Sequence, residues 1–374
     1  MMRIPANGGQ LVPLDSVCKI VQGGRQKLSG KHFIEEGGYP AYGAGGHNGN
    51  LPSFEFDEPA VVLSAIGARC GKCFQPSGKW SSLANTSVFF PAPDKAEIRF
   101  LWYQLNDESS WHRSGTAQPY IKPSDIKGRK IYLPPLAEQK RIAGILDAAD
   151  ALRAKRRESL AQLDTLLQST FLTLFGDPVT NPMGWVVEPL GEMCDVRDGT
   201  HDSPKYVEAG HPLLTSKNFK DGQIDCTGAN LISDEDFSQI NKRSKVDVGD
   251  LVMPMIGTIG KPVLVEQEPD FAIKNVALIK FSEESPDNRF IRALLCSHYF
   301  DHITSKANRG GTQKFVALKD LRGMPIPLPP LDLQRRFAAI IESVERQKAR
   351  VRAHLAELDA LFASLQSRAF DGEL

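Results

Sequence analysis

The chain has 374 residues, of which 41% are hydrophobic and 24% are charged, and its formal net charge is zero. This length and composition predict an ordinary soluble protein of two or three domains, each with its own core. The sequence contains no apolar run long enough to span a bilayer and no signal-peptide pattern, so we expect a cytoplasmic protein. The neutral charge argues against a protein that simply coats nucleic acid with a basic surface.

Residues 1–133 predict a mixed α/β domain. They hold 15 Lys and Arg against 11 Asp and Glu, a net charge of +4. Residues 61–66 and 87–90 are β-prone runs bounded by glycine, proline and asparagine, which is typical of strands. Residues 99–105 predict a helix late in this domain.

A glycine-rich stretch, YGAGGHNG at residues 42–49, superficially resembles a dinucleotide-binding fingerprint. No strong strand precedes it, and the residues that follow end in Pro52 and do not start a helix. That context argues against nucleotide binding. We expect a flexible surface loop that can approach another backbone closely.

Six cysteines are present, and only the Cys70-Gly71-Lys72-Cys73 spacing is recognisable. A CxxC pair can be a redox centre or half of a zinc site. Because the sequence holds no second pair and no histidine cluster near it, we favour two small residues at a turn. The remaining thiols are expected to be reduced, as is usual in the cytosol.

Residues 134–177 predict one long helix. Pro134 and Pro135 suit its first turn, where a missing N–H is harmless. Only Gly144 interrupts the run that follows, and Gly176 and Pro178 mark its end. At about 1.5 Å per residue, roughly 36 helical residues make a rod of about 54 Å.

Residues 178–328 repeat the plan of the first domain at lower similarity. They hold 17 Lys and Arg against 21 Asp and Glu, a net charge of −4. Residues 251–257 correspond to 61–67, and Asn275 corresponds to Asn85. Near the helix the match is firmer, since residues 125–128 fall on 320–323. The sequences of the two domains therefore agree next to the long helices and differ in the rest of each domain.

The long helix recurs at residues 329–374. LPPL at 133–136 falls on LPPL at 328–331, and Gln139 falls on Gln334, at a constant shift of 195 residues without a gap. A match of this kind indicates an internal duplication. In the second copy a 4-3 spacing forms a heptad seam of Ile341, Val344, Lys348, Val351, Leu355, Leu358, Phe362, Leu365 and Ala369. The matched line in the first copy is weaker in its middle, where Arg153 and Arg156 replace apolar residues.

A helix with one apolar stripe must cover that stripe, and the two copies can cover each other. We predict that the two helices pair as an antiparallel coiled coil and also offer apolar surface to partner helices. The residues assigned to pairing and docking are Leu146, Leu160, Leu163, Leu167, Phe171, Ile341, Val351, Leu355, Leu358 and Phe362, with Ile142 and Phe337 as further apolar candidates. The alternative is two separate amphipathic helices, each lying on its own domain.

The run LPPLAEQKRI, followed by a long helix that ends in FGDP and is then repeated, resembles the specificity subunit of type I restriction-modification enzymes. The resemblance implies target-recognition domains of mixed α/β fold at 1–133 and 178–328, joined by spacer helices at 134–177 and 329–374. It implies a double-stranded DNA site in two unlike halves. It also implies two methyltransferase subunits as partners, with restriction subunits as an option. S-adenosylmethionine, ATP and magnesium would then belong to the partners, and this chain would hold no cofactor.

Base-reading side chains are expected on loops, from residue types that reach base edges or phosphates. The candidates in the first domain are His47, Asn48, Arg69, Lys72, Gln118 and Lys122. Those in the second domain are Lys217, Asn218, Thr258, Lys261, Lys274, Arg309 and Lys314. Each could equally be a solvated surface residue, and Gln118 matches Gln313, which also fits a structural role at the joint.

The sequence shows no catalytic motif that we recognise. Residues 181–184 read NPMG and not (N/D)PP(Y/F), and no GxxxxGK(S/T) loop is present. Residues 269–274 lack the acidic partner of a nuclease motif. We therefore expect a non-catalytic subunit that selects the site. The competing interpretations are a scaffold that spaces two protein-binding domains, and a single-chain enzyme of unrecognised type.

Overall fold

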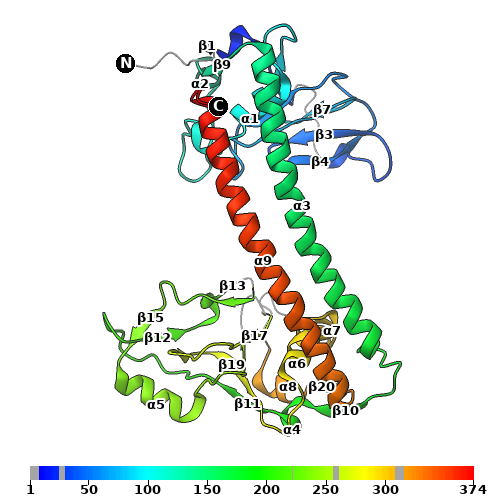
Figure 1. Ribbon diagram of the computed structural model, residues 1–374, viewed down its shortest axis with the longest axis vertical. Coiled ribbons are helices and arrows are strands. Elements are labelled where there is room, and N and C mark those ends of the chain that lie inside the picture. Colours follow the sequence, from blue (N-terminus) through cyan, green and yellow to red (C-terminus); the bar gives the residue numbers. More distant parts are fainter. Residues whose placement is uncertain (1–7, 25–29, 221, 256–260, 308–315) are drawn as a thin grey trace. The chain divides into compact units, whose positions relative to one another are not determined.

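The computed structural model describes residues 8–24, 30–220, 222–255, 261–307 and 316–374 (Figure 1). The chain divides into two compact units, Met1–Glu158 with Val351–Leu374, and Ser159–Arg350. We call them unit 1 and unit 2. Each unit combines one α/β domain with parts of both long helices. In the ranges given above, no helix is both long and apolar enough to cross a bilayer.

Unit 1 contains two sheets, a two-stranded ribbon and short helices. The four-stranded sheet has the order β2 (Cys18–Gln22), β8 (Thr86–Pro91), β5 (Val61–Ser64), β6 (Cys73–Phe74). The three-stranded sheet has the order β4 (Gly46–Leu51), β3 (Tyr39–Gly43), β7 (Ser81–Ser82), and the ribbon pairs β1 (Gln10–Pro13) with β9 (Lys130–Leu133). The helices are η1 (Leu14–Ser16), η2 (Gly30–His32), α1 (Ile98–Leu105), η3 (Glu108–Ser110) and α2 (Pro123–Lys127).

Unit 2 has the same kinds of element. Its four-stranded sheet has the order β11 (Asp195–Asp198), β19 (Val276–Lys280), β16 (Leu251–Pro254), β17 (Val263–Leu264). The three-stranded sheet is β15 (Asn230–Ile232), β12 (His211–Leu214), β18 (Ala272–Ile273), and the ribbons are β10 (Val186–Pro189) with β20 (Pro325–Leu328) and β13 (Phe219–Lys220) with β14 (Gln223–Ile224). Its short helices are α4 (Leu190–Met193), η4 (Ser216–Asn218), α5 (Asp234–Ser244), α6 (Asn288–Leu295), α7 (His298–Ala307) and α8 (Leu318–Arg322).

The strand orders confirm the duplication. In both units the central sheet is antiparallel, and the small sheet joins one antiparallel pair to one parallel pair. The strands predicted at 61–66 and 87–90 are β5 and β8, and the helix predicted at 99–105 is α1. Among the described residues, α5 and the β13–β14 ribbon have no counterpart in unit 1, so the two domain bodies differ as the sequence predicts.

One backbone detail marks the repeat at residue level. Asn85 and Asn275, matched in the sequence, both adopt the left-handed conformation, with φ of 66° and 55°. Asparagine tolerates this region better than other side chains that carry a Cβ. Each asparagine ends the turn before the central strand of its sheet, β8 in unit 1 and β19 in unit 2.

The glycine-rich stretch is not the flexible loop that the sequence predicts. Residues 42–49 form the turn and inner strands of the β3–β4 hairpin. At Gly46, with φ of +105°, an added Cβ would lie 2.9 Å from the ring of Phe74. Glycine therefore serves here to let a hairpin pack against an aromatic ring. The stretch lacks β-branched residues, which is why its strand character is hard to predict.

The two long helices, α3 (Leu136–Phe175) and α9 (Leu331–Phe370), have 40 residues each. Each begins at the leucine that directly follows its proline pair, and β9 and β20 end at the leucine that directly precedes it. In unit 1 the first part of α3 packs beside the last part of α9, and in unit 2 the last part of α3 packs beside the first part of α9 (Figure 1). The predicted antiparallel pairing is confirmed.

Candidate nucleic-acid interface

A buried glutamine joins each long helix to its domain. In unit 1 the Gln139 side chain accepts a hydrogen bond from the main-chain N–H of Glu97 (2.8 Å), the residue that caps α1. Its amide donates to the carbonyls of Lys95 (2.9 Å) and Pro134 (2.7 Å). In unit 2 Gln334 accepts from Asp287, the cap of α6, and donates to Pro329, both at 2.8 Å.

The predicted seam is the buried side of the helix pair. In α9 every position of the predicted line is buried or half-buried, and in α3 all are except Arg156, which is exposed. In unit 1 the aromatic residues Phe362 and Phe370 of α9 pack against Tyr103 and Phe100 of the domain. In unit 2 Phe171 and Phe175 of α3 pack against Phe337 and Phe290. These contacts anchor each end of the pair to a domain.

The two flanks of the seam differ in chemistry. On one flank Arg157 of α3 pairs with Asp359 of α9 at 3.2 Å. The opposite flank carries leucines, in unit 1 Leu152 and Leu361, each 49% exposed, and in unit 2 Leu166, 48% exposed. Leu166 and Leu361 are matched by the duplication. Exposed leucines beside a coiled-coil seam suit contact with a further helix.

Unit 1 gathers three loops at one end of its sheets. The Arg69 side chain donates to the carbonyl of Gly45 in the β3–β4 turn (2.7 Å). The N–H of Gly67 donates to the carbonyl of Pro119 (2.9 Å), so the segment before α2 lies against the same loop. The candidates His47, Asn48, Arg69, Gln118 and Lys122 are all exposed, and Lys72 is half-buried. The loops that carry these candidates are thus linked by the Arg69–Gly45 and Gly67–Pro119 hydrogen bonds.

In unit 2 the candidates are more scattered. Lys217 and Lys261 are exposed, and Lys274 donates to Ser203 at 2.5 Å. Asn218 is buried, and its side chain accepts from Thr215 and donates to the carbonyl of Asp225, both at 3.0 Å. Asn218 is thereby committed to the loop, and we leave it out of the proposed DNA surface. Thr258, Arg309 and Lys314 lie outside the described residues, as does Gln313.

A polar network beside Lys274 was not predicted from the sequence. The two ring nitrogens of His201 face Asn275 Oδ1 and Asp198 Oδ2, each at 2.7 Å. Arg243 of α5 binds the other oxygen of Asp198. The two partners of His201 lie 3 and 74 positions from it in the sequence, and no local pattern connects them. His201 is exposed on unit 2, but both of its ring nitrogens are committed to this network.

This network makes the stability of unit 2 depend on pH. The hydrogen bonds to Asn275 and then Asp198 raise the pKa of His201, because both partners accept from the ring. A raised folded-state pKa contributes stability that is complete below the unfolded-state value, about 6.5, and is lost as the pH rises through the folded-state pKa. We expect His201→Gln to lower the free energy of unfolding more at pH 5.5 than at pH 8.5. Urea titrations at both values measure this, and an equal loss at both would contradict it.

The Cys70–Cys73 pair is structural in its surroundings. Both thiols are buried and donate to main-chain carbonyls, Cys70 to Ala65 (3.4 Å) and Cys73 to Leu105 (3.3 Å). Burial raises the pKa of both, which disfavours the reactive thiolate. Burial likewise raises the pKa of Cys18 to about 12. The geometry supports the interpretation of small residues at a turn.

Thiol labelling of the native protein checks this arrangement. We expect one thiol, Cys226, to react rapidly with an aromatic disulfide reagent at pH 8, because it is the exposed cysteine. Cys226→Ser should remove the fast phase and leave slow phases that follow unfolding. A fast phase that persists after both Cys226 and the half-buried Cys296 are changed to serine would show that a buried thiol, such as Cys70 or Cys73, is accessible.

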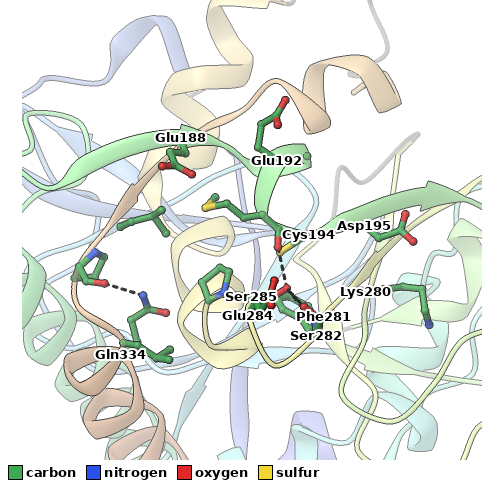
Figure 2. Close-up of a pocket in the computed structure, with 16 residues that line it drawn as sticks. Glu188, Glu192, Cys194, Asp195, Lys280, Phe281, Ser282, Glu284, Ser285 and Gln334 are labelled. Carbon is green, nitrogen blue, oxygen red and sulfur yellow. Dashed lines mark hydrogen bonds between the residues drawn. The ribbon is translucent and has the colours of Figure 1, made fainter.

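A pocket of about 930 Å³ lies in unit 2 at the start of α9 (Figure 2). Its charged lining is mostly acidic, with Glu188, Glu192, Asp195 and Glu284 against Lys280. Lys280 is itself bound to Asp250 at 2.6 Å. Carboxylates repel phosphate, so this pocket is not part of a DNA-binding surface. The hydrogen bonds in Figure 2, from Gln334 and Ser285, hold its walls together.

The architecture is that of a tandem recognition protein, in which one α/β domain occurs twice and each copy is built onto a pair of long helices. The model of the type I restriction modification DNA specificity domain matches residues 8–163 and again residues 182–359. The chain therefore belongs to the family of type I restriction-modification specificity subunits, and the family assigns it a role in DNA recognition. The resemblance in the sequence is confirmed.

Curated relatives and solved structures agree with this family. The chain is 27% identical over 312 residues to the type I restriction enzyme MjaVIII specificity subunit of Methanocaldococcus jannaschii, covering 77% of this chain and 73% of the relative. It is 25% identical over 319 residues to the EcoBI specificity subunit of Escherichia coli, covering 75% and 66%. In fold it is similar to the S subunit of a type I restriction-modification system from M. genitalium, with a TM-score of 0.61 and 15% identity over 99% of this chain and 98% of that one.

Proposed function

We propose that this chain selects a DNA site made of two unlike half-sites for a type I restriction-modification complex. The observation that carries the proposal is the pair of units with one strand order and different loops. Two copies of one fold suit two successive contacts with the two-fold symmetric DNA duplex. Because α5 and the β13–β14 ribbon occur in unit 2 alone among the described residues, the two half-sites should differ in sequence.

The long helices would determine the unread gap between the half-sites. Each helix runs without a break from one unit into the other. Each helix is also held to the domain before it, α3 through Gln139 and α9 through Gln334. Adding one heptad to both helices should therefore lengthen the gap by about three base pairs, since seven residues rise about 10 Å. The half-sites should stay the same.

The leucine flank of the helix pair supports docking of two methyltransferase subunits. Leu166 in unit 2 and Leu361 in unit 1 occupy matched positions and are similarly exposed. Two matched apolar surfaces on one chain suit two copies of one partner. In this proposal the chain itself is non-catalytic, and the partners bring S-adenosylmethionine and, with restriction subunits, ATP and magnesium.

The central test is co-expression with a methyltransferase subunit of a type I system, followed by mapping of methylated adenines. The proposal expects one split motif with two unlike halves, and a gap that grows by about three base pairs after the heptad insertion. A scaffold that spaces two protein-binding domains would give no methylated motif. If methylation occurred with the same gap after the insertion, the long helices would not determine the gap.

Partner docking has a separate test. Leu166→Asp and Leu361→Asp should each reduce the methyltransferase that co-purifies, and the double variant should lose both copies. Leu11→Asp, which changes an exposed leucine far from either helix in the sequence, is the matched control. Unchanged stoichiometry in the double variant would place the docking surface elsewhere.

A further inference from the structure

Each long helix places a cation on the seam at the same position of the duplication. Arg153 of α3 and Lys348 of α9 differ by the constant shift of 195 residues that relates the two copies. The Lys348 side chain is 6% exposed and that of Arg153 is 18% exposed. A buried charge in an apolar seam is costly unless it is paired. The partners of these two cations are therefore informative.

The two cations have equivalent partners. In unit 1 Arg153 binds Asp359 of the other helix at 2.5 Å, and Asp150 of its own helix at 2.9 Å. In unit 2 Lys348 binds Asp164 of the other helix at 2.6 Å, and Glu345 of its own helix at 2.8 Å. Asp164 matches Asp359, and Asp150 matches Glu345, at the same shift of 195 residues.

Other registers of the helix pair lack these partners. If α9 moved by one heptad in one direction, Arg352 would come opposite Arg153, and Arg157 would come opposite Lys348. In the other direction Gln366 would face Arg153, and Phe171 would face Lys348. In the first direction like charges would meet both cations. In the second direction a neutral amide would replace the carboxylate opposite Arg153, and an apolar ring would meet Lys348. Leucines on the seam discriminate less, because a leucine one heptad away offers the same surface.

We propose that the ion pairs Arg153–Asp359 and Lys348–Asp164 select the register of α9 on α3, and so act as positioning residues for the gap of the DNA site. The register part stands on the helix geometry alone, while the gap part rests on the proposed function. A slip of one heptad moves one helix along the other by about 10 Å, which is about three base pairs of DNA. A polar residue at a core position is a known way to specify register at a cost in stability.

The register is tested on the isolated full chain with spin labels. Ala154→Cys and Ala360→Cys place labels on exposed positions of α3 and α9 within unit 1, in a chain that also carries Cys226→Ser and Cys296→Ser. Pulsed electron resonance should give one distance for the parent. Arg153→Leu with Lys348→Leu should give at least one further distance. Its melting temperature should equal or exceed that of the parent, because leucine replaces two cations that are largely buried in an apolar seam.

Two controls separate register selection from general damage. Lys155→Leu with Arg350→Leu removes cations from matched, exposed positions and should keep the single distance. Exchanging the two cations, Arg153→Lys with Lys348→Arg, keeps the positive charge beside the same carboxylates and should also keep it, whereas Arg153→Asp with Lys348→Asp should broaden it. This last comparison decides the question if the leucine variant does not fold. A single distance in the leucine variant, or in the variant with Arg153→Asp and Lys348→Asp, would mean that the aromatic clusters alone fix the register. Either result would overturn the proposal.

The gap is read separately, by mapping methylated sites made by the complex that contains each variant. The leucine variant should methylate sites of more than one gap length, in steps of about three base pairs. If the labels show several registers and methylation still uses one gap, the gap part fails and the register part stands. If no variant or parent yields a methylated motif, the proposed function fails, and the label distances still decide the register.

Discussion

Replacing Phe337 with alanine should lower the free energy of unfolding of unit 2 by about 3–5 kcal/mol. Phe337 is buried at the first turns of α9, and its ring meets the rings of Phe171 and Phe175 at centroid distances of 5.6 and 5.3 Å. Removing it leaves a cavity where both long helices meet the core of unit 2. Such a loss is a large part of the stability of a typical domain.

Urea unfolding, followed by tryptophan fluorescence and circular dichroism, measures this change. Leu172→Ala is the matched control, since Leu172 lies between Phe171 and Phe175 in sequence but is exposed. It should change the free energy of unfolding by no more than about 0.5 kcal/mol. Equal effects of the two variants would show that Phe337 does not anchor the helix pair.

Gln139→Leu should destabilise unit 1 by about 2–4 kcal/mol, because it removes all three hydrogen bonds of a buried side chain at once. The N–H of Glu97 and the carbonyls of Lys95 and Pro134 would lose their partner. Gln334→Leu should cost less, since Gln334 makes two of the matching bonds. The expected order of stability is therefore parent, Gln334→Leu, Gln139→Leu.

The control is Gln168→Leu, which changes an exposed glutamine on the same helix α3 and should be near neutral. Differential scanning calorimetry provides the comparison. In the methylation assay, Gln139→Leu should loosen the domain on its helix and reduce methylation at intact sites. A Gln139→Leu protein as stable as the parent would contradict the role of the glutamine as the joint.

The long helices are the most predictable part of the fold, because both their duplication and their heptad seam can be recognised from local sequence patterns. The heptad line that includes Ile341 and Leu358 coincides with the buried face of α9. The glutamines that link the long helices to their domains could be located in the sequence, but their role could not be inferred from it. Gln139 and Gln334 stand out in the repeated motif, yet their main-chain partners near residues 95 and 287 lie more than forty positions away.

The candidate DNA surface was less predictable for the same physical reason. His201 depends on Asn275, which is 74 residues away, and Asn218 is a loop residue whose burial no local pattern reveals. Gly46 of the β3–β4 hairpin is explained by the ring of Phe74, which packs on it from β6. Contacts between residues that are distant in the sequence cannot be predicted from local sequence patterns.

The way α9 is shared between the units affects the order in which the chain can fold during synthesis. Unit 1 includes Val351–Leu374, so its first domain is translated long before the residues that complete it. Until then Phe100, Ile142 and Leu146 lack the cover that Ala369 and Phe370 provide. On a ribosome the nascent domain must wait, with apolar surface open, for nearly the whole chain to emerge. A nascent chain arrested before Val351 should therefore bind chaperones through these residues, and release should coincide with the arrival of the last turns of α9.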